Sequence, residues 1–458
     1  MSSENKMAIM PVKKLLLSMG IPIIFSMMLQ ALYNIIDSAF VSNMANNGEA
    51  ALNALTLAFP IQMLMVAISI GTGVGVNALI AKCLGENDRK RASLTTGNAV
   101  FLGIIIYLVF LLFGLFGTEF YIKTQSSNPM IIKMASNYLK ICCIFSFGIV
   151  FYSLYEKIIQ ATGRTVYTTI AQVLGAVVNI ILDPILIYGL CGLPAMEVEG
   201  AALATVIGQL VSFVLNLYFH FKLDHEIDNK LTYLKPNKRI IMEIYTIGFA
   251  AIIAQALMSI MTYALNIILV TVGENVVTAY GLYYKIQQFI LFAAFGLRDA
   301  ITPIVSFNYG MKNKKRIKEG IKYGLIYTII VMFIGFVLLE GSANIFVNVF
   351  GLSGETALIC KGAIRIISIS FIFAGINIAT QGCFQALSEG LASLLVSILR
   401  QFILVIPVAW LFALMVNNYH MSTSLLWLTF IIAEGLTAIV SLILLKKTIN
   451  NKVNIIKD

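Results

Sequence analysis

The segment 321-IKYGLIYTIIVMFIGFVLL-339 is almost wholly apolar and contains one charged residue, Lys322, near its start. A helix that crosses the hydrocarbon core of a bilayer needs roughly 20 mostly apolar residues. The segment therefore predicts a membrane-spanning helix, and 101-FLGIIIYLVFLLF-113 has the same character.

Segments of this kind follow one another along the whole chain. Twelve can be counted, at about 15–40, 53–82, 94–117, 134–155, 165–190, 199–222, 241–270, 275–307, 321–346, 361–383, 392–416 and 422–445. Only 12% of the residues are charged, about half of the roughly 25% that is usual in soluble proteins. We therefore expect an all-α membrane protein with twelve transmembrane helices and no soluble domain that could carry an enzyme.

Lys and Arg gather in alternate loops. They crowd the N-terminal residues, the C-terminal tail and the loops near 82–91, 157–164, 222–239 and 312–318, whereas acidic residues mark the opposite loops. Cytoplasmic loops of membrane proteins are enriched in Lys and Arg. We therefore expect a multi-pass protein of the inner or plasma membrane with both termini in the cytoplasm. The net charge of +10 then reports topology, and we expect no nucleic-acid partner.

The two halves of the chain are related by a shift of 225 residues. This shift places 160-QATG-163 on 385-QALS-388, and 89-RKR-91 on 314-KKR-316. The repeat predicts two lobes of six helices each.

The longest basic connector, 222–239, separates six predicted spans from six others. We predict an N-lobe at 1–221, a linker at 222–240 and a C-lobe at 241–458. Because each half has an even number of spans, both copies insert with the same orientation, and their pseudo-twofold axis runs along the membrane normal. Two such lobes can open a central cleft alternately to each face, which is typical of transporters.

Polar residues recur on one face of two predicted spans. Asp37 lies well inside the first span, and Gln30 and Asn34 share its helix face. In the fifth span Asn179 and Asp183 share a face in the same way. Charged groups inside a membrane are costly and mark functional sites.

Carboxylate, amide and hydroxyl oxygens are hard ligands that suit Na⁺ or a proton and give no soft-metal site. Thr205 in the sixth span adds another such oxygen, and Pro184 leaves the carbonyl of Ile180 without its helical donor. The six cysteines form no C-x-x-C pair, and the three histidines are scattered. We therefore expect no cofactor, and no metal other than Na⁺ as a candidate coupling ion.

The second half lacks an equivalent pair of acids. Asp37 falls on Leu265 when the repeats are aligned, and the clear mid-span acid of this half is Glu434, which aligns with Gln209. Glu434 is either a second coupling or substrate site or the ion-pair partner of a basic residue such as Arg400.

The run 71-GTGVGVNALIAKCLG-85 contains glycines at spacings that suggest nucleotide binding. It lies inside a predicted span with no preceding strand, so it does not predict such a site. Its small residues Gly71, Gly75 and Ala78 instead predict close contact with a neighbouring helix.

Several short motifs together give the chain a family resemblance. They are Pro22 and Asp37 in the first span, then 60-PIQMLMVAISIGTGVGVNALIAKCLGEND-88, 160-QATGRT-165, 179-NIILDP-184, 200-GAALAT-205 and 385-QALSEG-390. In this order and spacing the chain resembles bacterial members of the multidrug and toxic compound extrusion (MATE) family over about residues 11–447. The larger group around this family includes lipid-linked oligosaccharide flippases.

The resemblance implies two six-helix lobes that alternate between inward-facing and outward-facing states, and cation-coupled export of organic, often cationic, drugs. In the DinF-like branch the cation site belongs to the N-lobe. Its roles fall here on residues that match the motif: Asp37, Asn179, Asp183 and Thr205, with Tyr138 in the place of a tyrosine near that site. The other main branch uses C-lobe acids in helices seven and eight, where this chain has only Asp299.

We therefore predict a monomeric antiporter in membrane lipid that exports amphipathic or cationic small molecules, and not an enzyme. The alternative is a lipid-linked oligosaccharide flippase of the same larger group. It would need basic residues in its cleft, for which Arg365 and Arg400 are the candidates. An ion channel, less favoured, would carry steady current without saturation.

Overall fold

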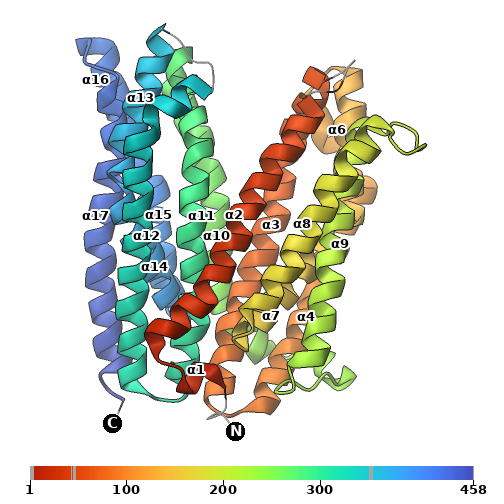
Figure 1. Cartoon of the computed structure of the whole chain (residues 1–458), viewed down its shortest axis with the longest axis vertical. Helices are drawn as coiled ribbons and strands as arrows, with labels where there is room; N and C mark the ends of the chain where they lie inside the picture. Colours follow the sequence, from red (N-terminus) through yellow and green to blue (C-terminus); the bar gives the residue numbers. More distant parts are fainter. Residues whose placement is uncertain (1–4, 43, 45–47, 350–353, 457–458) are drawn as a thin grey trace. The chain divides into compact units, whose positions relative to one another are not determined.

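The structure is a computed structural model that describes residues 5–42, 44, 48–349 and 354–456 of the chain (Figure 1). All regular secondary structure in these residues is helical. This result confirms the all-α fold class that the apolar segments predicted.

The helices follow the chain in this order. Those of the first half are α1 (Lys6–Ile9), α2 (Val12–Ser42), α3 (Gly48–Gly85), α4 (Arg89–Phe116), α5 (Thr118–Lys123), α6 (Pro129–Ile144), α7 (Phe147–Ala161), α8 (Thr165–Tyr188), α9 (Glu197–Leu223) and the 3-10 helix η2 (Leu231–Leu234). Those of the second half are α10 (Lys238–Val270), α11 (Glu274–Gly310), α12 (Lys314–Val349), α13 (Gly354–Ser368), α14 (Phe371–Ala386), α15 (Gly390–Ile398), α16 (Val405–Tyr419) and α17 (Ser424–Thr448), with π-helical turns η3 (Leu399–Ile403) and η4 (Ile449–Val453).

Twelve transmembrane helices can be assigned in the described part of the chain. Ten helical segments are individually long and apolar enough to cross a membrane. Two further spans are bent pairs, because α6 and α7 meet at 44° and α13 and α14 meet at 49°. The number of spans agrees with the number predicted from the sequence.

One predicted boundary is wrong. The fourth span was expected to end near residue 155, which would leave Lys157 in a basic loop. Instead α7 continues to Ala161, and Lys157 is a buried residue of that helix. Sequence hydropathy ended the span too early because Glu156 and Lys157 interrupt the apolar run.

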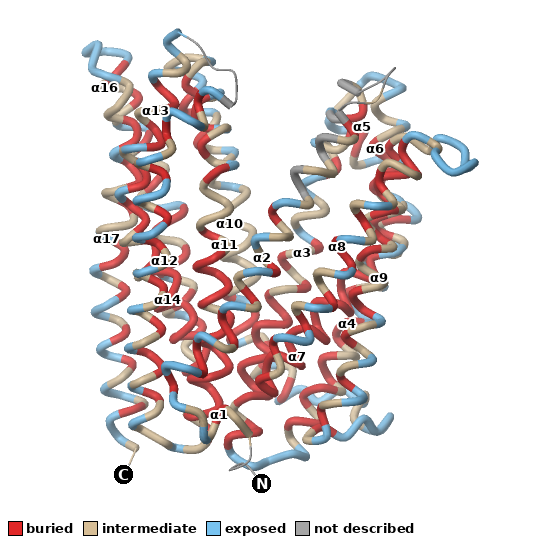
Figure 2. Tube along the Cα trace, in the orientation of Figure 1, coloured by how far each residue is buried: buried red, intermediate tan, exposed pale blue. Residues whose placement is uncertain are grey.

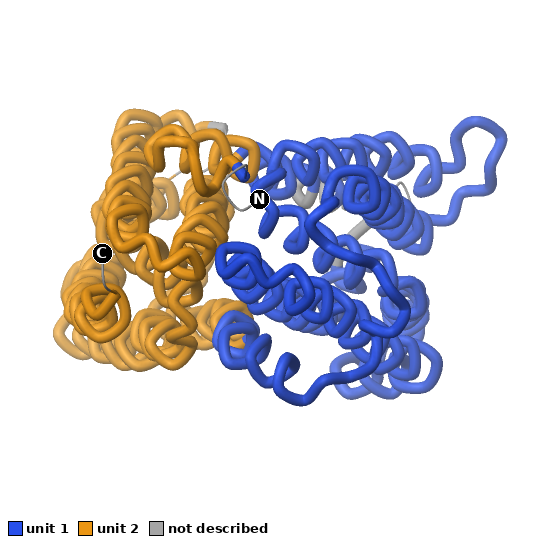
Figure 3. Tube along the Cα trace, turned by 90° about the horizontal axis from the view of Figure 1, so that it is seen from below, with its two compact units in different colours: residues 1–5, 25–252 blue, residues 6–24, 253–458 orange. Residues whose placement is uncertain are grey.

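Contacts divide the chain into two compact units, which Figure 3 shows in different colours. Unit 1 comprises residues 1–5 and 25–252, and unit 2 comprises residues 6–24 and 253–458. Helices α2 and α10 each contribute to both units, because the divisions fall inside them. The boundaries predicted for the repeated halves at 222–240 remain predictions.

Large apolar side chains lie on the outside of each unit as well as in its core (Figure 2). In unit 1, Leu112 and Phe116 of α4 are exposed, and in unit 2 the same is true of Phe333 and Leu338 of α12. Contiguous exposed apolar surface marks a membrane or partner contact. In helices of this length and hydropathy it is the surface that faces lipid.

The internal repeat is visible in the backbone. Asn87 and Lys312 both have positive φ, at 60° and 56°, and so do Gly163 and Ser388, at 88° and 57°. Each of these four turns closes with a hydrogen bond from the following N–H to the carbonyl five residues earlier. Left-handed residues that terminate helices in this way are usually glycine. Their recurrence at the spacing of the repeat indicates that both halves keep one helix-ending geometry.

Glycines bring α3 and α10 into close contact within unit 1. A Cβ on Gly75 would overlap the carbonyl oxygen of Ile244, and a Cβ on Gly248 would lie 2.8 Å from the carbonyl oxygen of Gly71. Ala78 is buried in the same contact. The prediction that small residues of the 71–85 run allow close helix packing is therefore confirmed, and the run lies inside α3.

A second glycine contact joins α8 to α9. A Cβ on Gly175 would overlap the hydroxyl of Ser212 and lie 2.5 Å from the carbonyl oxygen of Gly208. The Ser212 hydroxyl donates a hydrogen bond of 3.1 Å to the carbonyl of Ala171. Small residues at such positions let backbones approach closely, which is a main source of helix association in membranes.

Substitution Gly175→Ala should therefore destabilise the protein. The added methyl group meets backbone and a bonded hydroxyl, and overpacking of this kind costs about 1–3 kcal/mol. The midpoint of thermal unfolding of the purified protein in detergent measures the effect.

Gly281→Ala provides the matched control, because no heavy atom lies within 4 Å of a Cβ at Gly281. Alanine favours helix over glycine, so this variant should unfold at the same temperature as the unaltered protein or higher. Equal losses in both variants would contradict a special α8–α9 contact.

Candidate cation site

The polar faces of α2 and α8 meet in unit 1. Nε2 of Gln172 donates a hydrogen bond of 3.2 Å to Oε1 of Gln30. Asp37 lies two turns further along α2, and it is near enough to Asp183 of α8 for their charges to interact. The structure thus brings together the acids of the two polar stripes.

Asn179 and Thr205 join this pair across the contact between α8 and α9. Nδ2 of Asn179 donates a long hydrogen bond of 3.5 Å to Oγ1 of Thr205. The helices lie this close because of Gly208, where an added Cβ would be 3.0 Å from Cβ of Asn179. The glycine contact that holds α8 on α9 therefore also positions two of the predicted ligands.

Several oxygens of this group are buried without a donor. Among the described residues, none donates a hydrogen bond to either carboxylate oxygen of Asp183, to Oδ1 of Asn179 or to Oδ1 of Asp37. Leaving a buried polar atom unpaired costs roughly 1–3 kcal/mol, and an unpaired charge costs more. A cation among these oxygens, or a proton on a carboxylate, would remove that cost. The four residues therefore form a set of candidate cation ligands.

Two tyrosines lie beside this set. Nε2 of Gln62 donates a hydrogen bond of 3.0 Å to the hydroxyl of Tyr138, and Tyr138 is within electrostatic range of Asp37. Tyr33 interacts in the same way with both acids. The sequence prediction included Tyr138 but missed Tyr33 and Gln62. Tyr33 sits one helical turn before Asp37, so the periodicity that identified Gln30 also marks this residue.

The side chain of Asn34 lies outside the described residues, although its backbone belongs to α2. Its predicted place near the cation site therefore stays a prediction. Pro184 lies inside α8, which continues to Tyr188. Because proline has no N–H, the carbonyl of Ile180 lacks its helical donor one turn from Asp183.

The mid-span acid of unit 2 is held in an ion pair. Nη2 and Nε of Arg400 donate to Oε1 of Glu434 at 2.6 and 3.0 Å. Nδ2 of Asn377 donates to Oε2 of Glu434 at 2.7 Å, and the hydroxyl of Ser441 donates to Oδ1 of Asn377 at 3.1 Å. Of the two interpretations of Glu434, the geometry favours the ion pair with Arg400.

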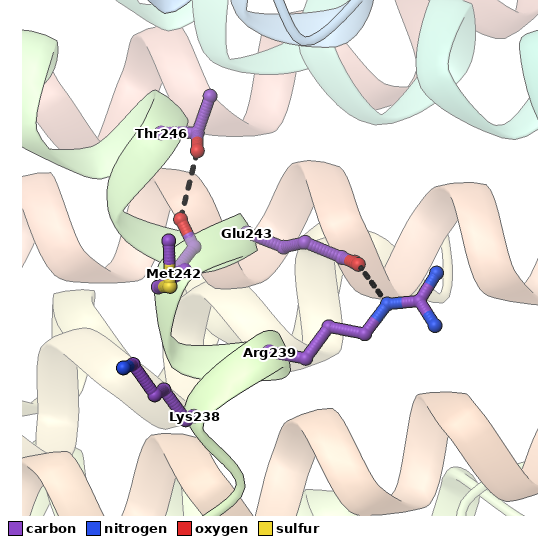
Figure 4. A pocket seen from close by; sticks show the side chains of 5 residues that line it. All are labelled: Lys238, Arg239, Met242, Glu243 and Thr246. Carbon is purple, nitrogen blue, oxygen red and sulfur yellow. Dashed lines mark hydrogen bonds and ion pairs between the residues drawn. The ribbon is translucent and has the colours of Figure 1, made fainter.

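A pocket at the start of α10 is separate from the cation site. It is lined by Lys238, Arg239, Met242, Glu243 and Thr246 (Figure 4). Nε of Arg239 donates to Oε1 of Glu243 at 3.3 Å, and the hydroxyl of Thr246 donates to the carbonyl of Met242 at 2.8 Å. The predicted site residues are not among those that line this pocket.

A bundle of twelve membrane spans with an internal repeat and buried carboxyl groups without donors defines a membrane transporter. The family model MatE matches residues 22–185 and 250–411, one segment in each half. The chain therefore belongs to the MatE family, which confirms the resemblance found in the sequence. The DinF-like branch stays a prediction.

Similar proteins support this assignment over nearly the full length. The multidrug export protein MepA of Staphylococcus saprophyticus is 23% identical over 425 residues, which cover 93% of this chain and 91% of the relative. An outward-facing multidrug resistance MATE family transporter of the MOP superfamily is 25% identical with a TM-score of 0.89, covering 96% of each chain. A MOP superfamily transporter from Pyrococcus furiosus, described as having a binding pocket of reverse polarity that suggests a different function, is also 25% identical, with a TM-score of 0.88 and 97% of each chain covered.

These similar proteins are transporters. Membership of the family therefore confirms the predictions of a multi-pass membrane protein and of a protein that is not an enzyme.

Neutralising the two mid-span acids Asp183 and Glu434 should have opposite effects on stability. In Na⁺-free buffer Asp183→Asn should unfold at the same temperature as the unaltered protein or higher, because it removes a buried charge without a donor. Glu434→Gln leaves the guanidinium of Arg400 buried and uncompensated, and breaking such a pair costs about 3–5 kcal/mol. Thermal unfolding in detergent measures both. A large loss in Asp183→Asn would show that Asp183 has a stabilising partner.

Proposed function

We propose that this protein is a cation-coupled antiporter that exports organic, amphipathic or cationic compounds by alternating access. The observation that carries the proposal is the set of buried carboxylate oxygens on Asp37 and Asp183 that lack protein donors. A structural acid in a membrane bundle is paired, as Glu434 is with Arg400. Acids left without a partner are suited to a mobile cation.

In the proposed cycle Na⁺ or H⁺ enters from outside and binds among Asp37, Asn179, Asp183 and Thr205. Two carboxylates close together in a poorly solvated site are unfavourable while both are ionised. Binding of one cation relieves this repulsion and favours the arrangement of α2 and α8 in which the acids are closest. Coupling follows if that arrangement belongs to one of the two conformations, because a ligand shifts an equilibrium only by its difference in affinity.

The proposed substrate class rests on the relatives. Curated proteins that match more than nine-tenths of the chain are named multidrug export proteins, and a solved structure of the same fold is a multidrug resistance transporter. The oxygen ligands serve Na⁺ and H⁺ equally well, so the proposal names both. We also propose that the chain works as a monomer with both termini in the cytoplasm, as the basic loops favour.

The flippase alternative is less favoured by the contacts of its two basic candidates. Arg400 is engaged by Glu434, and Nε of Arg365 lies 3.8 Å from Oε2 of Glu340. Pyrophosphate recognition needs basic side chains that are available to the ligand. Both arginines have carboxylate partners instead.

Asp37→Asn should abolish coupled transport while leaving the protein folded. In liposomes, a Na⁺ or pH gradient should drive ethidium movement by the unaltered protein, and this movement should fall about 10-fold or more in the variant, a size typical of lost coupling. Fluorescence of the dye follows the movement.

Glu119→Gln is the control for removal of one negative charge. Glu119 lies in α5, outside the spans, and its hydrogen bond from Lys123 lowers its pKa, so it is ionised at neutral pH. This variant should transport normally. Gradient-driven transport by Asp37→Asn at the unaltered rate would refute the assigned site, and an unaltered protein that responds to neither gradient would refute the antiporter.

A further inference from the structure

Helix α7 carries charged residues into the interior of unit 1. Every residue from Gly148 to Ala161 is buried. Glu156 is 8% exposed and Lys157 4% exposed, within a bent span that crosses the membrane. Charges at such positions are rare and require a reason.

Three side chains of α7 form a small network. Nζ of Lys157 donates to Oε1 of Gln160 at 3.0 Å, and Nε2 of Gln160 donates to Oε1 of Glu156 at 2.7 Å. Nζ of Lys157 is 3.7 Å from the same oxygen of Glu156. Lys157 therefore neutralises Glu156 at a distance beyond that of a close hydrogen bond, while Gln160 contacts both.

The surroundings of Lys157 recur in the other half with the residue types exchanged. In unit 1 a Cβ on Gly73 of α3 would lie 2.8 Å from Cγ of Lys157. In unit 2 the equivalent positions are Arg298 of α11 and Gly382 of α14, and a Cβ on Gly382 would lie 2.9 Å from Cγ of Arg298. Each half therefore packs the stem of one basic side chain against a glycine at the same place.

A side chain to backbone hydrogen bond recurs at the same contact. Nδ2 of Asn77 donates to the carbonyl of Lys157 at 2.9 Å, and Oγ1 of Thr302 donates to the carbonyl of Gly382 at 3.4 Å. The helix packing at this point is thus common to both halves and does not depend on Glu156.

The acid itself does not recur. The repeat places Glu156 on Gln381, just as it places Asp37 on Leu265. Gln381 donates from Nε2 to the hydroxyl of Ser397 at 3.0 Å, which is an ordinary structural contact. Glu156 therefore occurs only in the half that carries the candidate cation ligands, although the other half forms the same helix contact without it.

Polar groups connect Glu156 to that site. Tyr152, one turn earlier on α7, interacts electrostatically with Glu156 and with Tyr33, and Tyr33 interacts with both acids of the site. Along the α3–α7 contact the hydroxyls of Ser69 and Ser153 and Oδ1 of Asn77 are buried and receive no hydrogen bond from the described residues. Buried polar atoms of this kind are usually satisfied by water or an ion.

We propose that Glu156 is a second carboxylate station for the coupling cation, between the Asp37–Asp183 site and the end of α7 at Ala161. The proposal rests on the proposed antiport. Before the cation arrives, Lys157 neutralises Glu156. The cation then replaces Lys157 at the carboxylate, Lys157 keeps its contact with Gln160, and the cation leaves to the aqueous phase beyond Ala161. No covalent bond forms or breaks.

The test compares two kinds of ethidium movement by the full-length protein in liposomes. One is movement driven by a Na⁺ or pH gradient, and the other is exchange of ethidium across the membrane without a gradient, which needs the conformational cycle but no cation. Glu156→Gln should lose about 10-fold or more of the gradient-driven movement and keep the exchange.

The double variant Glu156→Gln with Lys157→Met separates transfer from charge pairing, and it decides the question if Glu156→Gln fails to fold. It leaves no unpaired charge in α7, so a purely structural role for Glu156 predicts that coupled transport returns. The proposal predicts that it stays lost. Restored coupling in the double variant, normal coupling in Glu156→Gln, or loss of exchange in a folded Glu156→Gln would each overturn it. If Asp37→Asn is uncoupled while Glu156→Gln is normal, only the second station fails; if the unaltered protein is uncoupled, the antiport itself fails.

Discussion

A charge inside a membrane bundle must be neutralised, and this requirement governs the polar interior of both units. In a poorly solvated interior the cost of an unpaired carboxylate is several kcal/mol. Glu434 meets the requirement within the protein, through Arg400 and Asn377. Asp183 does not, because no described residue donates to it. The folded chain can keep such a group only by leaving it protonated or by binding a cation, so this one residue links stability to the ionic conditions around the protein.

The two halves share their packing and differ in their charges. Glycine contacts, left-handed turns and bent spans recur at the spacing of the repeat. The acids at positions 37 and 156 have apolar or neutral counterparts in the second half. Architecture and chemistry are therefore encoded by different residues, and the chemistry of one half can change while the helices of both keep their places.

The sequence predicted the elements well because span length and polar periodicity are local properties. Asp37 and Asp183 were identified from helix faces alone, and the structure brings them together. It could not predict which partner Glu434 would choose, since that choice depends on the π-helical turn that carries Arg400. Nor could it place Lys157, because a lysine near a basic loop has the same local pattern whether it is exposed or buried. Contacts between distant segments, such as Gln62 with Tyr138, have no local signal.

The recurrence of the turns at Asn87 and Lys312 bears on how such a protein arose. The simplest ancestor is a chain of half this length that paired with a second copy of itself. In such a pair every acid is present twice, because both copies are translated from one gene. Only after duplication and fusion could one copy lose an acid while the other kept it. One-sided chemistry in a two-fold scaffold is thus a property that the ancestor was unable to evolve, and it dates the present division of labour to a time after the fusion.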